Sequence, residues 1–310
     1  MMFGVVAALI FVFLFQFRVV RGQRKFCTKT GILYRSLLAI HDMKIPAKQF
    51  ALLFFWVFAF AVGEASSAAK PEPMPLSGAI NKAGRQRMLT QRIVKAYCQL
   101  GLRVQPDKSR VILEKSVSLF DAQLAELRQY SFTPDIQDAL AKEAALWGEF
   151  RAIALAPVSH DGAKKLMEQN EALLQAAHKA TMLLESASGT KSGKLVNLAG
   201  RQRMLSQRLA KFYMLRRWGF SQPEIASGIE QAQNEFGGAL QTLADAPGKT
   251  MQIQQELDLA KIQWIFFKNA LTQHDSGADL MYASNVATSS EHILELMDDI
   301  AALYEKSDGS

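Results

Sequence analysis

Apolar residues recur every three or four positions along most of the chain, from about residue 77 onwards. This spacing is typical of amphipathic helices, because residues three and four apart lie on the same helical face. Two examples are the series Leu113, Val117, Phe120, Leu124, Leu127 and the series Ile136, Leu140, Ala144, Trp147, Phe150. No strand pattern stands out against this spacing, so the sequence predicts an all-α protein.

The pattern occurs twice, at an offset of 116 to 117 residues. Residues 79–97 read AINKAGRQRMLTQRIVKAY, and residues 195–217 read LVNLAGRQRMLSQRLAKFYMLRR. The repeat continues beyond these two motif segments, where Phe236, Leu240, Leu243, Ile253, Leu257, Trp264 and Phe267 match Phe120, Leu124, Leu127, Ile136, Leu140, Trp147 and Phe150. A repeat of this length indicates that a whole domain is duplicated.

Helix-breaking residues divide each copy into four helices. The breaks fall at Gly101–Pro106, Ser131–Pro134 and Ala156–Gly162 in the first copy, and at Gly219–Pro223, Ala246–Gly248 and Asp275–Gly277 in the second. Thr133 is expected as an N-cap, with Pro134 at the first helical position. We therefore predict two tandem antiparallel four-helix bundles, residues 77–190 and 191–308, that together form a pseudo-dimer.

Each motif segment has two faces whose residues are suited to burial, whereas an ordinary amphipathic helix has one. The first is a core face with Leu198, Leu205, Leu209, Phe212 and Tyr213. The second carries small residues and one arginine, with Ala199, Gly200, Arg203, Gln207, Ala210 and Met214 matched by Ala83, Gly84, Arg87, Gln91, Val94 and Cys98. Small residues allow another helix to come close, and a guanidinium among them is costly to desolvate unless an anion or a carboxylate meets it. We expect the two motif helices to pack together through this face.

The motif resembles the one found in PilJ/NarX-type sensor domains, the N-terminal domains of type IV pilus chemotaxis transducers and of nitrate/nitrite sensor kinases. Residues 80–88 read INKAGRQRM and fit that motif fully, whereas residues 196–204 read VNLAGRQRM and depart at Val196 and Leu198. The resemblance implies a four-helix bundle over nearly all of residues 77–308. It also implies that the motif arginine, Arg87 or Arg203 here, binds nitrate or nitrite where two motif helices meet.

The candidate anion site therefore consists of Arg87, Arg203, Asn81, Gly84, Gln91, Asn197, Gly200 and Gln207. If the two arginines face each other, their repulsion strains the empty site, and an anion between them relieves the strain. The alternative for each arginine is a surface position or a carboxylate partner. Asn81 and Asn197 are equally suited to cap their helices.

The remaining residues of the motif and its surroundings have simpler interpretations. We expect a solvated flank formed by Arg85, Arg92, Arg201 and Arg208, with Lys95 and Lys211 at its edge. Trp147 and Trp264 are expected in the core. Cys98 is expected to be a buried, inert thiol.

The N-terminal region has two interpretations. Residues 1–20 are apolar, residues 21–48 are basic and residues 50–62 are apolar again, which suits a helical hairpin anchor with its basic loop inside the cell. The second apolar run has only 13 residues, which favours a signal peptide over residues 43–65, with Met43 as start and cleavage after Ala65. Residues 1–42 would then be an extension or an anchor, and residues 66–76 a linker. Either way the folded part is expected outside the cytoplasm, periplasmic or anchored in the inner membrane.

Charge and composition exclude several classes of function. The net charge is +7, but residues 1–65 hold eight Lys/Arg against two Asp/Glu, so the remainder has 28 basic and 27 acidic residues. This near-neutral remainder argues against nucleic-acid binding. The two cysteines and five scattered histidines have no metal-ligand spacing, and no catalytic constellation can be assembled, so we expect no metal, no cofactor and no enzyme activity.

The function we expect is an extracytoplasmic sensor or binding protein for a small oxyanion, nitrate or nitrite favoured. The chain stops at Ser310 after its eighth helix, so we expect no output domain of its own and a membrane sensor or transducer as possible partner. Both a monomeric pseudo-dimer and a homodimer remain open. The alternative is a helical interaction module that docks on a type IV pilus, a chemotaxis receptor or a membrane complex and binds no small ligand.

Overall fold

The computed structural model describes residues 74–307, except residue 131 and residues 273–278. The expectations for residues 1–65 and for most of the linker lie outside this range. All regular structure in the described part is helical, with the helices α4 (Leu76–Gly101), α5 (Pro106–Arg128), α6 (Pro134–Leu155), α7 (His160–Ser188), α8 (Lys191–Arg217), α9 (Pro223–Asp245), α10 (Met251–Thr272) and α11 (Asp279–Ser307). The all-α prediction is confirmed. Within the described residues, no helix combines the length and apolarity needed to cross a membrane.

The helices begin where local chemistry favours a start. Proline occupies the first turn of α5, α6 and α9, where its missing N–H leaves no bond unmade. Ser159 and Thr190 cap α7 and α8, because their hydroxyl oxygens accept hydrogen bonds from the backbone N–H groups of Gly162 and Gly193. Thr133 takes the N-cap position of α6 as predicted, but its side chain makes no capping hydrogen bond.

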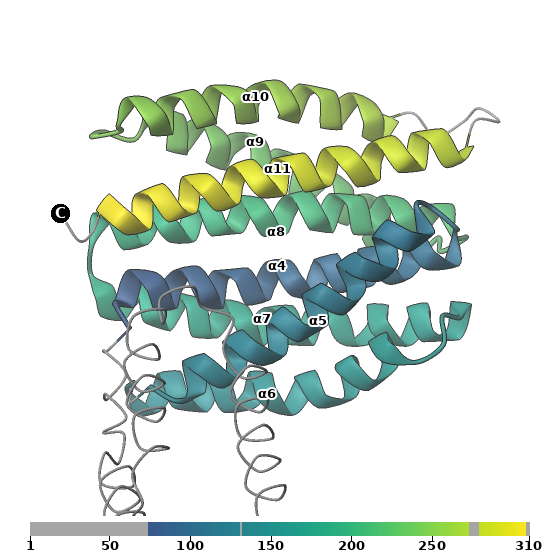
Figure 1. Ribbon diagram of the computed structural model, residues 1–310, viewed down its shortest axis with the longest axis horizontal. Helices are drawn as coiled ribbons and strands as arrows, with labels where there is room; N and C mark the ends of the chain where they lie inside the picture. Colours follow the sequence, from purple (N-terminus) through teal and green to yellow (C-terminus); the bar gives the residue numbers. More distant parts are fainter. Residues whose placement is uncertain (1–73, 131, 273–278, 308–310) are drawn as a thin grey trace, which may run out of the picture. The chain divides into compact units, whose positions relative to one another are not determined.

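The eight helices form two bundles with the same internal packing. In the first, α4 packs against α5 and α7, and α6 packs against α7 and α5. In the second, α8 takes the place of α4, with α9, α10 and α11 following in the same order. The two motif helices α4 and α8 lie side by side at the centre, with the remaining helices of each bundle on the outer sides (Figure 1). The predicted tandem bundle architecture is therefore present.

Equivalent aromatic pairs fill the two bundle cores. Trp147 stacks on Phe120 with ring centroids 3.8 Å apart, and Trp264 stacks on Phe236 at 4.2 Å. Both tryptophans are buried, as predicted. Stacked aromatic pairs contribute beyond the burial of their area, so these pairs help to hold α6 to α5 and α10 to α9.

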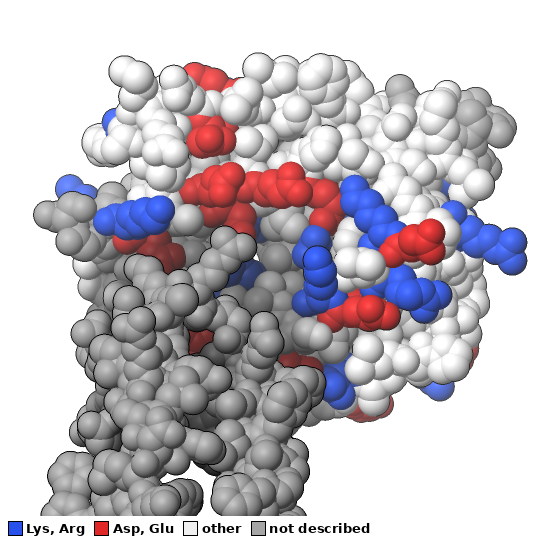
Figure 2. All heavy atoms as spheres, in the orientation of Figure 1, with Lys and Arg blue, Asp and Glu red and all other residues white. Residues whose placement is uncertain are grey.

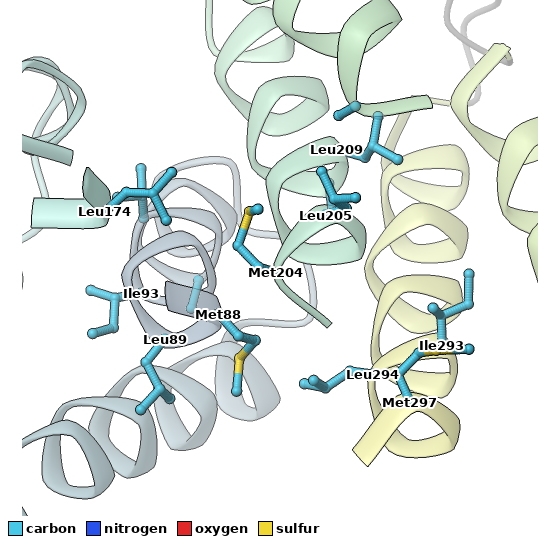
Figure 3. Packing of buried hydrophobic residues seen from close by; sticks show 14 of the residues in the cluster. Met88, Leu89, Ile93, Leu174, Met204, Leu205, Leu209, Ile293, Leu294 and Met297 are labelled. Atoms are coloured by element: carbon cyan, nitrogen blue, oxygen red, sulfur yellow. The ribbon is translucent and has the colours of Figure 1, made fainter. Parts of the chain in front are cut away.

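The central position of α4 and α8 buries them on nearly every side. In Figure 3 the apolar side chains of α4 and α8, including Met88 and Met204, meet those of α7 and α11. Polar residues of the motif are buried with them, because neighbouring helices cover most of the surface of both helices. Cys98 is one of these buried residues, and burial raises the pKa of its thiol well above the usual value. This agrees with an inert thiol.

Only Gly189 and Thr190 separate α7 from α8. Gly189 has φ of 63°, the left-handed conformation that ends a helix without strain when the residue has no side chain. The last helix of the first bundle therefore passes directly into the motif helix of the second.

Candidate functional site

The two motif arginines meet at the contact between α4 and α8. A β-carbon at Gly84 would lie 3.3 Å from Nη2 of Arg87 and 3.6 Å from Nη2 of Arg203. A β-carbon at Gly200 would lie 3.4 Å and 3.0 Å from the same two atoms. Both guanidinium groups therefore sit against both glycines. The absence of side chains at these positions leaves the space that the two groups occupy.

Each arginine reaches across to the opposite motif helix. Nη2 of Arg87 donates to the backbone oxygen of Asn197 at 3.3 Å and to its Oδ1 at 2.7 Å. Nη2 of Arg203 donates to the backbone oxygen of Asn81 at 3.3 Å. The asparagine side chains are fixed in turn, because Nδ2 of Asn81 donates to Glu305 and Nδ2 of Asn197 donates to Glu185. These asparagines lie inside their helices, so they do not act as caps.

Both guanidinium groups are almost completely removed from water, at 1% and 0% exposure. Burial first, and then the charges of Arg203 and Arg201, lower the pKa of Arg87 to about 9, so it stays charged at neutral pH. Within the described part of the chain, Nε of Arg87 and Nε of Arg203 are buried without a hydrogen-bond partner. An anion bound between these two buried cations would accept hydrogen bonds from their unpaired N–H groups and compensate their charge.

The two arginines contact different side chains on the helices that flank the junction, α11 and α7. Nη1 of Arg203 donates to Asp298 of α11, which also accepts from Nη2 of Arg85 at 2.7 Å. Nη1 of Arg87 lies 3.3 Å from Nδ1 of His178 of α7 instead. Burial alone would raise the pKa of Asp298, but Arg203 and Arg85 outweigh it and hold the pKa below its usual value. Arg203 thus has a built-in counter-ion, so the symmetric repulsion expected from the sequence is relieved on one side.

The remaining two candidate residues contact other groups. Nε2 of Gln91 donates to Thr90 Oγ1, and Nε2 of Gln207 donates to the backbone oxygen of Ser290. Both side chains are buried, and their Oε1 atoms have no hydrogen-bond partner among the described residues. The structure therefore brings together six of the eight candidate residues and gives Gln91 and Gln207 contacts of their own.

The expectation of a solvated flank with two lysines at its edge is wrong for the lysines. Lys95 and Lys211 are 0% and 3% exposed, because α11 covers one and α7 covers the other. Nζ of Lys95 contacts Ser290 and Glu291, whereas Nζ of Lys211 donates to Oδ1 of Asn170 at 2.8 Å.

The four flank arginines are partly buried and ion-paired rather than freely solvated. Their carboxylate partners are Asp298 for Arg85, Glu291 for Arg92, Glu235 for Arg201 and Glu171 for Arg208. These partners come from helices α7, α9 and α11 of the two bundles. The flank therefore ties the motif helices to their neighbours.

Sequence reasoning missed the acidic and imidazole groups on α7 and α11. They match in pairs at an offset of 120, where Glu171, His178 and Glu185 correspond to Glu291, Asp298 and Glu305. The motif helices match at 116, so one fixed offset hides the correspondence. An alignment that allowed the offset to grow along the repeat would have revealed it.

A cavity of about 210 Å³ opens beside Arg87 on the α7 side of the junction. Its polar lining includes Arg87, His178, Arg201, Arg208, Glu171 and Glu235 from helices α4, α7, α8 and α9. Among the described residues no cluster of three or more His, Cys, Asp or Glu side chains is placed to hold a metal ion. The cavity thus places the buried guanidinium of Arg87 beside an imidazole and two arginine–glutamate ion pairs.

Comparison with known proteins gives one match. The family described as type IV pili methyl-accepting chemotaxis transducer N-terminal domains, PilJ, matches residues 75–180, which cover α4 to α6 and most of α7. The second bundle is not part of that match. No curated protein and no solved structure matches the chain.

Proposed function

We propose that the chain senses a small oxyanion, because residues 75–180 match the PilJ family of chemotaxis transducer N-terminal domains. The family is sensory, which agrees with a binding role and not with catalysis. In our proposal the second bundle is a further copy of the same domain. Nitrate or nitrite would bind at the contact between α4 and α8.

The observation that carries the proposal is the convergence of two buried guanidinium groups on Gly84 and Gly200. Two unit charges ~6 Å apart repel by about 3 kcal/mol at an effective dielectric constant of ~20. Asp298 compensates Arg203, whereas Arg87 makes no ion pair with a carboxylate in the described part of the chain. A small planar oxyanion at Arg87 would replace this unfavourable charge with charge-assisted hydrogen bonds.

We expect nitrate to raise the melting temperature of the protein. Ligand at ~100 times its dissociation constant adds about 2.7 kcal/mol to the free energy of unfolding. For a folded unit of this size that corresponds to a shift of ~5 to 10 °C. Scanning calorimetry with sodium nitrate or nitrite, against sodium chloride at equal ionic strength, measures the effect.

Two variants make the measurement specific. Arg87→Ala removes the uncompensated guanidinium and should abolish the shift. Arg151→Ala removes an exposed arginine of α6 that pairs with Asp121, and should leave the shift unchanged. An equal shift in Arg87→Ala, or none in the wild type with either anion, would contradict oxyanion sensing.

We also propose that the folded part lies outside the cytoplasm, with the signal peptide expected from residues 43–65. Lys44 and Lys48 precede the apolar run of residues 50–62, and small residues follow it. We expect the protein from the periplasmic fraction to have a mass that corresponds to a first residue near Ser66. A mature chain beginning at Met1, or recovery from the cytosol alone, would refute this prediction.

A second candidate function is protein docking without a small ligand, and the outer face of α10 favours it. Leu259, Ile262, Ile265 and Phe266 are each at least 50% exposed. The equivalent residues of α6, at an offset of 117, are Lys142, Ala145, Gly148 and Glu149. Figure 2 shows mixed charges on the face in view and a largely uncharged surface over α10. If calorimetry shows no effect of oxyanions on the melting temperature, this apolar face makes protein docking the favoured function.

A further inference from the structure

The two outer helices that cover the motif junction carry different groups at one equivalent position. His178 on α7 corresponds to Asp298 on α11, whereas the flanking pairs Glu171/Glu291 and Glu185/Glu305 are conserved between the two copies. The same arginine atom, Nη1, faces each of them: Arg87 faces His178 and Arg203 faces Asp298. The junction therefore has a carboxylate on one side and an imidazole on the other.

This difference decides which arginine is compensated. Asp298 accepts from Arg203 and from Arg85. On the other side Arg201, the equivalent of Arg85, pairs with Glu235 of α9 at 2.8 Å and leaves Arg87 without a carboxylate among the described residues. Arg203 thus already holds a carboxylate where Arg87 holds none.

His178 is suited to assist an anion in this position. Its Nδ1 lies 3.3 Å from a guanidinium nitrogen, which can only donate, so Nδ1 accepts and the proton of a neutral ring lies on Nε2. Burial, and then Arg87 and Arg201, lower the pKa of His178, which favours this neutral form. The Nε2–H group is then available as a donor.

The space for a ligand lies on the same side. The cavity of about 210 Å³ is lined by Arg87 and His178. Its walls also hold the ion pairs Arg201–Glu235 and Arg208–Glu171. A water molecule takes ~30 Å³ of liquid volume, so the cavity can hold an oxyanion of a few heavy atoms together with several waters. Arg87 is buried, and its Nε has no hydrogen-bond partner within the part of the chain that the structure describes.

The same imbalance recurs further along the motif helices. Lys95 is paired with Glu291 of α11, but the equivalent Lys211 donates to the neutral amide of Asn170 on α7 and lies over the ring of Phe212. A second cavity, of about 380 Å³, is lined by Asn170 and Lys211. On the α7 side neither buried cation of the motif helices forms an ion pair with a carboxylate among the described residues, whereas on the α11 side both do.

We propose that the chain binds one oxyanion and not two, beside the contact between α4 and α8, in the cavity lined by α4, α7, α8 and α9, held by Arg87 and His178. The carboxylate of Asp298 occupies the equivalent position at Arg203 as a permanent substitute for a second anion. This inference rests on the proposed function and adds the position and the number of the ligands.

Exchanging the two residues tests the assignment. Titration calorimetry of the full-length chain with sodium nitrate is expected to give one site per chain. His178→Asp places a carboxylate at Arg87 and should weaken nitrate binding at least tenfold. The neutral His178→Asn loses the imidazole donor but adds no charge, so it should weaken binding by about threefold. Asp298→His removes the carboxylate from Arg203 and should raise the stoichiometry to two.

Controls separate this inference from the proposed function. His292→Asp makes the same change on the exposed side of α11 and should leave binding unaltered. If Asp298→His does not fold, as judged by circular dichroism, Asp298→Asn is measured in its place, and His178→Asp still decides where the anion binds. Unchanged nitrate binding in His178→Asp, or one site in a folded Asp298 variant, would overturn the assignment while oxyanion sensing stands. No nitrate binding by the wild type would overturn both.

Discussion

Replacing Glu291 with glutamine is expected to lower the free energy of unfolding by ~3 to 5 kcal/mol, as when one partner of a buried ion pair is removed. Glu291 of α11 accepts from Arg92 and from Lys95 of α4, so it joins the two bundles. Its side chain is 9% exposed and that of Lys95 is 0% exposed, so the loss leaves a buried ammonium uncompensated. The expected decrease in melting temperature is ~6 to 20 °C.

The repeat supplies the control for this prediction. Glu171→Gln removes the equivalent carboxylate on α7, which is 53% exposed, forms an ion pair with Arg208 and accepts a hydrogen bond from Gln175. An exposed pair of this kind contributes about 0.2 to 1 kcal/mol. Urea unfolding of both variants at neutral pH measures the difference. Similar losses in the two variants would show that the cluster around Glu291 does not hold the bundles together.

The pH dependence follows from the same contacts. Burial alone would raise the pKa of Glu291, but Lys95 and Arg92 outweigh it and lower the pKa to about 2 from its ordinary value of 4.5. Above pH 4.5 the carboxylate is ionised in both the folded and the unfolded chain, and its full stabilisation is present. This stabilisation is lost as the pH falls from 4.5 to 2, so the wild-type and Glu291→Gln stabilities should converge in that range.

Glu143→Gln is expected to act in the opposite direction and to stabilise the protein at pH 8. Glu143 of α6 is 0% exposed, and neither carboxyl oxygen has a hydrogen-bond partner among the described residues. Burial raises the pKa of Glu143 to about 8 from 4.5. Between these values the folded chain keeps a proton that the unfolded chain has released, so the free energy of unfolding falls as the pH rises. The total loss is on the order of 4 kcal/mol.

Glutamine resembles the protonated acid in shape and does not titrate, so the variant should not show this loss. Unfolding by urea at several values between pH 4.5 and pH 8 measures the slope. Glu149→Gln, at an exposed position of the same helix, should keep the wild-type slope. A Glu143→Gln variant with the wild-type slope would mean that the carboxyl finds a partner that keeps it ionised.

The helical periodicity and the repeat were sufficient to predict the fold. Series such as Leu113 to Leu127 mark one face of each helix, and the repeated motif indicates two bundles related by the same packing. The motif also indicated which helices would meet, because glycines at equivalent positions beside one arginine leave room only for another helix. Gly84 and Gly200 lie against both guanidinium groups, which agrees with that expectation.

The surroundings of the arginines could not be predicted in the same way. Helical periodicity distinguishes one buried face of a helix from one exposed face. Lys95 and Lys211 fall on the face that it predicts to be exposed. These lysines are buried because α11 and α7 cover the motif helices from the sides, and that coverage depends on contacts between residues more than 40 positions apart. Asp298 and His178 were missed for the same reason.

The two-residue link at Gly189 and Thr190 has a consequence for how this junction can change over generations. In a dimer of identical chains every substitution appears on both sides of the symmetry axis, so such a junction cannot carry aspartate on one side and histidine on the other. Here one gene encodes both sides, and a single mutation alters only one of them. A junction within one chain can thus hold an ion pair at Arg203 and Asp298 on one side and an imidazole at Arg87 on the other.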